Sequence, residues 1–428
     1  MDELIVDILQ QLRDGSQGAL DTHQLEMLIN SHNSGIDSST HSTEREKLIP
    51  KRAILPYFLR VKQENSSLWQ SWNVSPELEE RFIRSVRMKP RRTASGVATI
   101  TVITRPHTCS SNCIYCPCDL RMPKSYLANE PACQRAELTF FDPYVQVAAR
   151  LQALHQMGHS TDKVELIVLG GTWSDYPEGY QYWFIKELFR ALNEWPNSPN
   201  HIKERLNWYT SFGLQNTEET LSSFVAEQQK AIFDDNTTYN QAFHKLYDAS
   251  KPHQSAWSQM QSTYDELVEQ QHVNETAAAR VVGLVIETRP DTITPENLRM
   301  FRQLGCTKIQ IGIQSTRQEI LDVNKRQMPV AQIKRAFSLI RLYGFKIHSH
   351  LMVNLLGATP EADKQDFKTF VTDPGFLPDE IKLYPCALVS GTQLVQKYRE
   401  GAWQPYAKDE LVDVLVQDVL ATPPYVRI

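Results

Sequence analysis

The feature that most constrains the fold of this chain is a repeated order of apolar, β-rich segments and amphipathic, helix-like segments. The β-rich segments contain many Val and Ile residues and fall at 98–104, 163–171, 280–291, 307–315, 345–357 and 380–388. Helical patterns with one apolar face follow several of them, at 142–158, 182–195, 295–305 and 331–344. Repeated β-then-α units predict an α/β fold with a parallel sheet, either doubly wound or an open or closed barrel.

Three regions lie outside this repeat. Residues 1–95 have helical patterns and become basic toward their end. Residues 197–276 are polar and predict helices inserted on the rim of a barrel. We therefore expect a helical N-terminal region over 1–95, a barrel over 96–395, and a C-terminal helix with the start of a linker over 396–428.

The composition is typical of folded soluble proteins. Hydrophobic residues make up 41% and charged residues 22% of the 428 residues, and the formal net charge is −5. Nucleic-acid binding would therefore need a local basic patch. The N-terminus lacks the basic and apolar regions of a signal peptide, and no apolar run is long enough to span a bilayer. We expect a cytoplasmic protein with no membrane partner.

The seven cysteines are unevenly spread along the chain. Five fall between positions 109 and 133, whereas Cys306 and Cys386 are isolated. An odd, clustered set in a reducing compartment indicates metal or redox chemistry rather than a disulfide framework. Cys109, Cys113 and Cys116 have the spacing CxxxCxxC directly after the predicted strand 98–104.

This cysteine spacing predicts a 4Fe–4S cluster. Such clusters usually take four thiolates, so three cysteines on one short loop bind three irons and leave the fourth open. A chelating amino acid such as the methionine end of S-adenosylmethionine (SAM) can occupy that iron, and the cofactor then supplies the radical chemistry. With Tyr115 before the third cysteine, the pattern resembles the CxxxCxΦC motif of radical SAM enzymes, which implies that the aromatic ring packs near the adenine.

A zinc site is the alternative interpretation of the same stretch. Zinc prefers paired CxxC units with a second Cys or His pair downstream, and His107, Cys118 and Cys133 are available to complete one. We interpret Cys118 and Cys133 as non-ligands, and Cys306 and Cys386 as small core residues.

A Gly–Gly–Thr sequence ends the predicted strand 163–171. In a β/α barrel, ligand sites lie at the carboxyl ends of the strands, and Gly170 and Gly171 permit a close approach of the backbone to a ligand. The pair, followed by Thr172, resembles the radical SAM element that binds the methionine amino group. Glycine pairs also commonly end strands without binding a ligand. The position of this pair, one helix after the cysteine loop, is what supports a role in binding SAM.

Polar residues interrupt the later strands. Glu287 and Arg289 lie in IETRPD, and Gln310, Gln314 and Ser315 lie in IQIGIQS. Buried polar groups need partners, and the ribose and carboxylate of a cofactor are suitable ones, so Glu287, Gln314 and Ser315 are candidate cofactor ligands. An internal hydrogen-bond network is the alternative.

Two histidines alternate along one strand face, at His348 and His350. We interpret them as core or pocket residues rather than metal ligands. The sequence assigns no residue a catalytic role.

A basic run precedes the first predicted barrel strand. Between positions 81 and 92 the chain has no acidic residue and carries Arg81, Arg84, Arg87, Lys89, Arg91 and Arg92. Such a cluster suits a phosphate backbone, because binding releases counterions from the nucleic acid. A solvated helix face is the ordinary alternative for a charge run.

Several motifs in fixed order then resemble the catalytic subunit of Elongator and its prokaryotic relatives. They are RTASGVATITV, RPHTCSSNCIYCPC, GHSTDKVELIVLGGTWSDYP, IETRPD, IQIGIQS, and DEIKLYPCALVSGT followed by REGAWQPY, and the match runs from about position 86 to the end. The resemblance implies a partial β/α barrel of the radical SAM type, followed in that family by an acetyltransferase domain.

The resemblance also implies a reaction and its partners. The family synthesises carboxymethyluridine in tRNA: a SAM-derived radical activates the methyl group of acetyl-CoA, which adds to C5 of the wobble uridine. By the same carry-over, Lys163 in DKVEL matches a lysine that contacts acetyl-CoA. The wobble base lies in a single-stranded loop and can enter a pocket, while the basic run would hold the anticodon stem. A reductase or another electron donor is a further expected partner.

This chain departs from the family pattern in two ways. It stops at PPYVRI, before the acetyltransferase domain, so we expect only the radical half here, with such a domain supplied in trans if at all. It also carries Asn354 where eukaryotic relatives tend to have an acid, which favours the prokaryotic branch. A radical SAM enzyme with another substrate, and a non-catalytic iron–sulfur or zinc RNA-binding module, remain alternatives.

Overall fold

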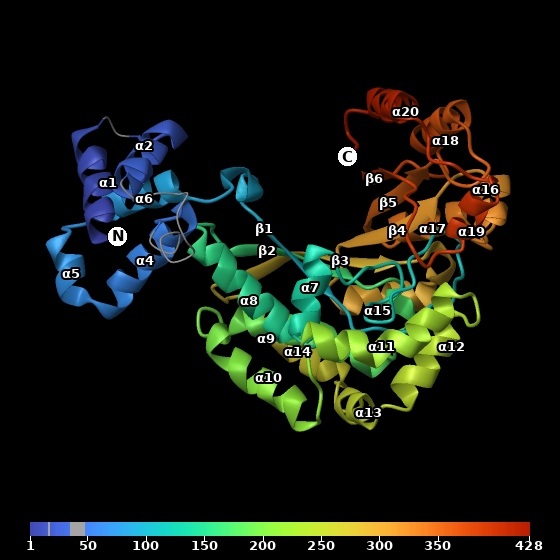
Figure 1. Ribbon diagram of the computed structural model, residues 1–428, viewed down its shortest axis with the longest axis horizontal. Coiled ribbons are helices and arrows are strands. Elements are labelled where there is room, and N and C mark those ends of the chain that lie inside the picture. The colour runs from blue at the N-terminus through green and yellow to red at the C-terminus, as the bar shows by residue number, and fades with distance from the viewer. Residues whose placement is uncertain (16–17, 35–47) are drawn as a thin grey trace. The chain divides into compact units, whose positions relative to one another are not determined.

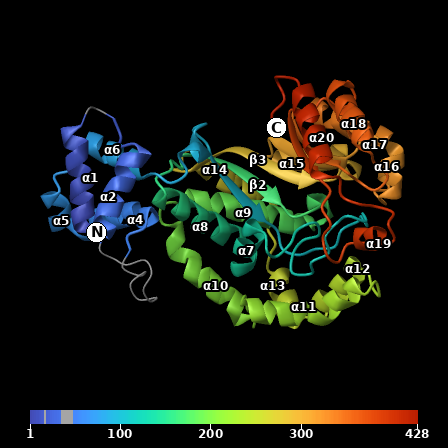
Figure 2. The same ribbon diagram turned by 45° about the horizontal axis from the view of Figure 1, so that its top comes forward.

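Six strands form one sheet in chain order in the computed structural model, which describes residues 1–15, 18–34 and 48–428. The strands are β1 (Ala98–Ile103), β2 (Lys163–Leu169), β3 (Arg280–Thr288), β4 (Lys308–Gln314), β5 (Lys346–Val353) and β6 (Glu380–Pro385). The pairs from β3 to β6 are parallel, as the β-then-α order requires. Figures 1 and 2 show the strands following one another across the sheet. The predicted partial β/α barrel is confirmed.

The chain divides into two units, one made of residues 1–98 with 149–163 and the other of 99–148 with 164–428. Residues 1–98 of the first unit consist mainly of helices. These are α1 (Asp2–Asp14), α2 (Thr22–Asn33), α4 (Lys51–Glu64), α5 (Ser66–Ser71) and α6 (Pro76–Val86), followed by a 3-10 turn at Pro90–Thr93. Apolar side chains recur on one face of α1, where Leu4, Ile5 and Ile8 are fully buried. A separate core thus stabilises this unit.

Helices connect successive strands. They are α7 (Pro131–Leu138), α8 (Pro143–Gln156), α9 (Glu178–Asn193), α15 (Pro295–Gln303), α16 (Gln318–Val323), α17 (Val330–Leu342) and α18 (Pro360–Thr372). Within the second unit, α9 packs on β3, and both α17 and α18 pack on β5. Prolines at the first turns of α15 and α18, each after a capping threonine, explain where these helices begin.

The segment between α9 and β3 consists of helices and turns. It contains α10 (Ile202–Ser211), α11 (Glu218–Phe233), α12 (Tyr239–Phe243), a π-helical turn at His244–Asp248, α13 (Lys251–Ser258) and α14 (Tyr264–Asn274). The last of these, α14, packs along α9. Figure 1 shows α10 to α13 in green and yellow, passing beneath the strands.

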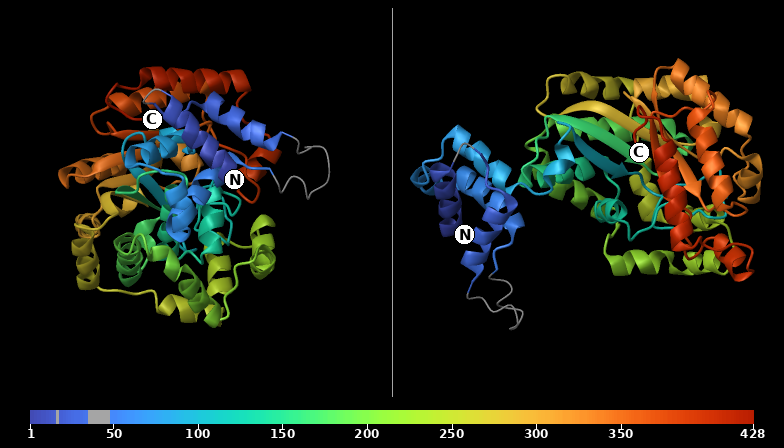
Figure 3. Two further views of the ribbon diagram at one scale, coloured as in Figure 1. Left: turned by 90° about the vertical axis from the view of Figure 1, so that its left-hand side faces the viewer. Right: turned by 90° about the horizontal axis from the view of Figure 1, so that it is seen from above.

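Two helices follow β6: α19 (Leu394–Arg399) and α20 (Lys408–Ala421). The red α20 runs beside α18 (Figure 3). Lys364 of α18 forms an ion pair with Asp413 of α20 at 2.5 Å. The chain then returns to the sheet, because the Ile381 amide donates to the Arg427 carbonyl at 2.8 Å. Over the residues described, no helix combines the length and apolar character needed to cross a membrane.

Candidate active site

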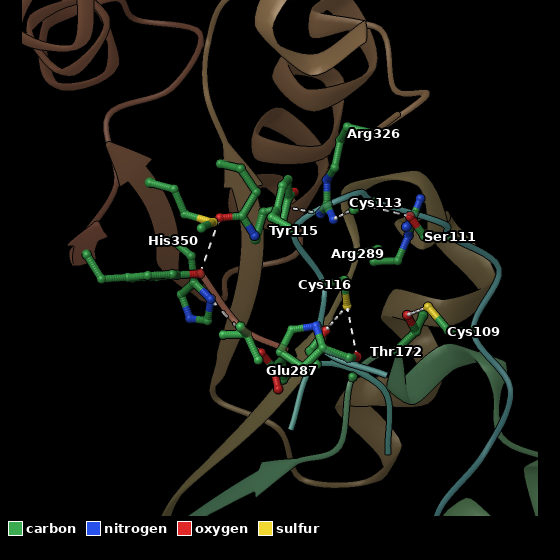
Figure 4. Close-up of a pocket in the computed structure, with 18 of the residues that line it drawn as sticks. Cys109, Ser111, Cys113, Tyr115, Cys116, Thr172, Glu287, Arg289, Arg326 and His350 are labelled. Carbon is green, nitrogen blue, oxygen red and sulfur yellow. Dashed lines mark hydrogen bonds and ion pairs between the residues drawn. The ribbon is translucent and has the colours of Figure 1, made fainter. Parts of the chain in front are cut away.

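A cavity of about 250 Å³ lies at the carboxyl ends of the strands, where a β/α barrel places its ligand sites. The loop after β1, the turn after β2 and residues of β3, β4, β5 and β6 all contribute to its wall (Figure 4). The lining includes Cys109, Cys113, Tyr115, Cys116, Gly171, Thr172, Glu287, Arg289, Gln314, Arg326, His350 and Tyr384. The structure thus brings together the predicted cysteines and most of the predicted cofactor ligands.

Each of the three predicted cluster cysteines has a hydroxyl group beside its sulfur. Cys113 Sγ lies 3.1 Å from Ser111 Oγ, and Cys116 Sγ lies 2.9 Å from Ser125 Oγ. Cys109 Sγ lies 3.7 Å from Thr172 Oγ1, which the turn after β2 supplies. Hydrogen bonds to ligand sulfurs tune an iron–sulfur cluster, so this arrangement suits thiolate ligands.

The electrostatic surroundings of the buried cysteines differ. Burial alone would raise the pKa of the Cys113 thiol, but the Arg326 guanidinium and the Ser111 hydroxyl lower it to about 7. Burial raises the pKa of Cys116 well above its ordinary value, against the opposing charge of Lys124. Cys113 is therefore the more readily available thiolate before any ligand binds.

The donor set fits an iron–sulfur cluster better than a single ion. The three thiols line one cavity, whereas no three His, Cys, Asp or Glu side chains within the described residues surround a point where one metal ion could bind. Separate irons of a cluster require the first arrangement.

The three residues that could complete a zinc site, His107, Cys118 and Cys133, are not part of the cavity wall. Cys133 is fully buried in an apolar cluster with Ile103, Met122 and Ala136. Cys118 packs against a different apolar cluster, and burial raises the pKa of its thiol. His107 packs edge-on against Tyr176 at 4.6 Å between ring centroids. These positions favour the interpretation of Cys118 and Cys133 as non-ligands.

Three residues of the cavity wall carry buried nitrogens without a hydrogen-bond partner in the described part of the chain. Arg289 Nη1, Arg326 Nε and His350 Nε2 are buried and have no hydrogen-bond partner among the residues that the structure describes. An unpaired buried donor is costly and usually marks an absent ligand or water. A polar, anionic ligand such as the carboxylate of SAM would match the buried Arg326 guanidinium, while Arg289 already pairs with Asp291.

The glycine pair after β2 makes a close backbone contact. A Cβ atom on Gly170 would lie 1.7 Å from Thr104 Oγ1, so this position accepts no larger residue without a shift. Gly171 has φ +83° and lines the cavity. The backbone of both glycines acts to lower the pKa of the Glu287 carboxyl group. The Gly–Gly element therefore shapes the floor beside Glu287.

Glu287 lies at the end of β3 and receives a hydrogen bond from the Tyr126 hydroxyl. Burial raises the pKa of its carboxyl group, although Tyr126 and the nearby glycine backbone oppose the shift. Arg289, two residues on, pairs with Asp291 through two hydrogen bonds of 2.7 and 2.8 Å. Both predicted polar residues of this strand end thus have defined orientations.

Of the two predicted residues at the end of β4, one lines the cavity and the other does not. Gln314 has φ +74° beside a register shift in the sheet, lines the cavity, and accepts a 3.3 Å hydrogen bond from Tyr384. Ser315 is buried instead against α18, where its hydroxyl donates to Asp366. The adjacent strand β5 shows the same contrast: His350 lines the cavity, whereas His348 lies 3.6 Å from Glu380.

Lys163 and the basic run belong to the other unit and lie outside this cavity. Lys163 is exposed at the first position of β2, about 20 Å along the strand from Gly170 at the usual rise per residue. Arg84, Lys89, Arg91 and Arg92 are exposed, and Arg84 pairs with Glu80 at 2.7 Å. Arg81 and Arg87 are half-buried.

Sequence reasoning missed Ser111, Ser125, Tyr126, Arg326 and Tyr384. Ser111 falls within the cysteine motif, so a rule that cluster sulfurs need donors could have found it. Arg326 lies between α16 and α17 in a stretch without a recognisable pattern, and only the fold brings it to Cys113, at 3.4 Å.

Comparison with known families gives two matches in the part of the chain that follows the cysteine loop. Residues 255–369 match the model of the radical SAM superfamily, and residues 378–428 match that of the radical SAM C-terminal domain.

Curated relatives extend the similarity over most of the chain. The tRNA uridine(34) acetyltransferase of Methanocaldococcus infernus is 33% identical over 82% of this chain and 54% of its own length. Elongator complex protein 3 of Bos taurus is 28% identical over 83% of this chain and 55% of its own. The chain thus spans a little over half the length of these relatives.

A solved structure shares the fold. The archaeal Methanocaldococcus infernus Elp3 with an N-terminal deletion superposes with a TM-score of 0.53 at 29% identity, covering 78% of this chain and 55% of that one.

Proposed function

We propose that this chain, which is homologous to Elongator complex protein 3 and the tRNA uridine(34) acetyltransferases and has the radical SAM fold, modifies the wobble uridine of tRNA. The observation that carries the proposal is one cavity lined by Cys109, Cys113 and Cys116 together with Gly171 and Glu287. Its position at the carboxyl ends of the strands is where such folds bind their ligands.

In this proposal Cys109, Cys113 and Cys116 would hold a 4Fe–4S cluster that leaves a site open for SAM. When bound, these groups supply a 5′-deoxyadenosyl radical. The chain's own residues bind and orient: Arg326 and Ser111 stabilise the Cys113 thiolate, which is the protonation state that binds iron. Thr172 and Ser125 do the same beside the other two sulfurs.

The remaining wall would hold SAM itself. Arg289 and Arg326 offer unpartnered nitrogens to its carboxylate. The charged form of Glu287, beside Gly170 and Gly171, is an acceptor for its amino group. Tyr115 packs with Met352 in the same apolar cluster and offers a ring face to adenine. Gln314 would contact the ribose, whereas Ser315, whose hydroxyl donates to Asp366 of α18, would support the position of Gln314.

The finer part of the proposal is the product, a carboxymethyl group at C5 built from acetyl-CoA. Lys163 would contact acetyl-CoA at the opposite end of β2 from the cysteines, which makes it a contact for a remote part of that molecule. The exposed residues Lys89, Arg91 and Arg92 would bind tRNA phosphates and set the register of the anticodon stem without reading bases.

The test is an anaerobic omission series. The reconstituted chain receives SAM, a strong reductant, acetyl-CoA and bulk tRNA, and 5′-deoxyadenosine and modified nucleosides are quantified with each component left out in turn. The proposal expects 5′-deoxyadenosine that rises with acetyl-CoA and tRNA, and a carboxymethylated uridine. SAM cleavage indifferent to both would favour another substrate. Bound zinc without iron and sulfide would favour the RNA-binding module.

A further inference from the structure

The three cysteines lie in a long segment with no regular structure. Between the end of β1 at Ile103 and the start of α7 at Pro131 the chain forms neither helix nor strand. Connections of this length are uncommon inside domains and are usually functional. Because each backbone N–H and C=O group needs a partner, such a loop keeps one shape only if other parts of the protein supply those partners.

The inserted segment between α9 and β3 supplies them through two amide side chains. At one end of the cysteine motif, the Cys109 amide donates to Asn240 Oδ1 at 3.1 Å, and Asn240 Nδ2 donates to the Cys109 carbonyl at 2.8 Å. Beyond its other end, Gln229 Nε2 donates to the Cys118 carbonyl at 2.8 Å, and the Leu120 amide donates to Gln229 Oε1 at 2.9 Å. Each amide thus pairs with the loop backbone as a neighbouring strand would.

Two buried tyrosines of the same segment hold the part of the loop that follows. Tyr247 donates to the Leu120 carbonyl at 2.7 Å, and Tyr239 donates to the Met122 carbonyl at 2.8 Å. Tyr247 lies in the π-helical turn at His244–Asp248, and such turns often occur at functional sites. Both tyrosine side chains are at most 4% exposed, so these hydrogen bonds are shielded from water.

Apolar and cation–π contacts fix the loop at two more points. Leu120 is fully buried in a cluster whose other members, among them Ile232 and Phe243, come from the inserted segment. Four residues before Cys109, the Arg105 guanidinium lies 4.0 Å from the centre of the Trp257 ring. The segment therefore contacts the loop from Arg105 to Met122.

We infer that the segment 197–276 fixes the conformation of the cysteine loop, and that Asn240 and Gln229 are positioning residues for the cluster. Neither side chain lines the cavity; they fix the backbone that carries Cys109 at one end and Cys116 at the other. This inference rests on the proposed function only in that Cys109, Cys113 and Cys116 bind a cluster. It assigns a role to a segment whose sequence indicates none.

The test compares iron release from anaerobically reconstituted full-length protein. The variants are Asn240→Ala, Asn240→Asp and Gln229→Ala, and the control is Asn207→Ala, an exposed position in α10. Asn240→Asp keeps the side-chain volume and an acceptor but loses the donor to the Cys109 carbonyl, so it separates hydrogen bonding from packing. The readouts are iron and sulfide per chain, the rate of iron transfer to a chelator, and the electron paramagnetic resonance spectrum of the reduced cluster.

The three variants should release iron about tenfold or more faster than the parent and show an altered spectrum, since residues that orient ligands typically change metal affinity by that factor. The control should match the parent, and the cluster-free variants should melt as the parent does. Release within twofold of the parent in all three variants overturns the inference while leaving the proposed function intact. So does faster release that only parallels a lower melting temperature. A parent chain that binds no iron overturns both.

Discussion

Arg326 Nη1 donates to Cys113 Sγ at 3.4 Å, while Nη2 of the same guanidinium donates to the carbonyl of Gly312 in β4. A single buried cation thus ties the cysteine loop to the central part of the sheet. Because it stabilises the thiolate against the effect of burial, it is the main reason that the pKa of Cys113 is about 7.

Replacing Arg326 by Met should therefore raise the pKa of Cys113, since burial would then act without an opposing charge. In the cluster-free protein, the pH midpoint for alkylation of Cys113 should move upward by about one pH unit or more, as followed by mass spectrometry of the labelled peptide. Lys325→Met, which removes the exposed cation next to Arg326 in sequence, serves as the control variant and should leave the midpoint unchanged. An unchanged midpoint would contradict the assigned role of Arg326.

Loss of any of the three cavity cysteines should abolish SAM cleavage. Cys109→Ala, Cys113→Ala and Cys116→Ala each remove one of three thiolates, and we expect iron content and 5′-deoxyadenosine to fall to background. Cys118→Ala is the matched control, because that thiol lies in the same loop but outside the cavity wall. Cleavage retained in a cysteine variant whose cluster content has been measured would refute the ligand assignment.

Charge reversal at Lys89, Arg91 and Arg92 should weaken tRNA binding. These side chains are exposed and lie within the run without acidic residues. If each contacts one phosphate, the slope of log affinity against log salt should flatten by about one per residue. Reversal of the exposed Lys203, Lys368 and Lys408 gives a protein of equal net charge, whose salt slope should stay that of the parent. Equal slopes in the two triple variants would count against this surface as the RNA contact.

A buried acid in α20 should make stability depend on pH. Burial, with the nearby Asp363 and Asp366, raises the pKa of Asp418 to about 7. A carboxyl whose folded pKa is raised adds stability at low pH, and this contribution is lost as pH rises from about 4 through 7. Asp418→Asn should therefore raise the melting temperature at pH 8 and change it little at pH 4. A larger gain at pH 4 than at pH 8 would have the wrong sign for this explanation.

The parts of the site that sequence could predict are those encoded locally. The spacing of Cys109, Cys113 and Cys116 on one loop and the glycine pair at a strand end depend on near neighbours, and the cavity wall contains the three cysteines and Gly171 of the pair. Alternation of strands and helices likewise predicts the parallel sheet, because both periods are short.

The remaining features depend on contacts between distant positions. Ser315 follows Gln314 directly, yet a left-handed backbone at Gln314 turns the two side chains to different surroundings, and no residue pattern predicts that φ value. Arg326 reaches Cys113 across 213 positions, and Asn240 reaches Cys109 across 131. A sequence read segment by segment has no signal for such pairs.

The sequence separation of Cys109 and Asn240 also determines when, during synthesis, this site can form. After adding Cys109, a ribosome has to add 131 more residues before Asn240, whose side-chain amide binds the Cys109 backbone, is part of the chain. Until then the cysteine loop lacks the side chains that bind its backbone. Contacts between positions so far apart in sequence form slowly in folding. The full set of hydrogen bonds around the cysteine motif therefore exists only after residue 240 has been made and the inserted segment has packed on the loop.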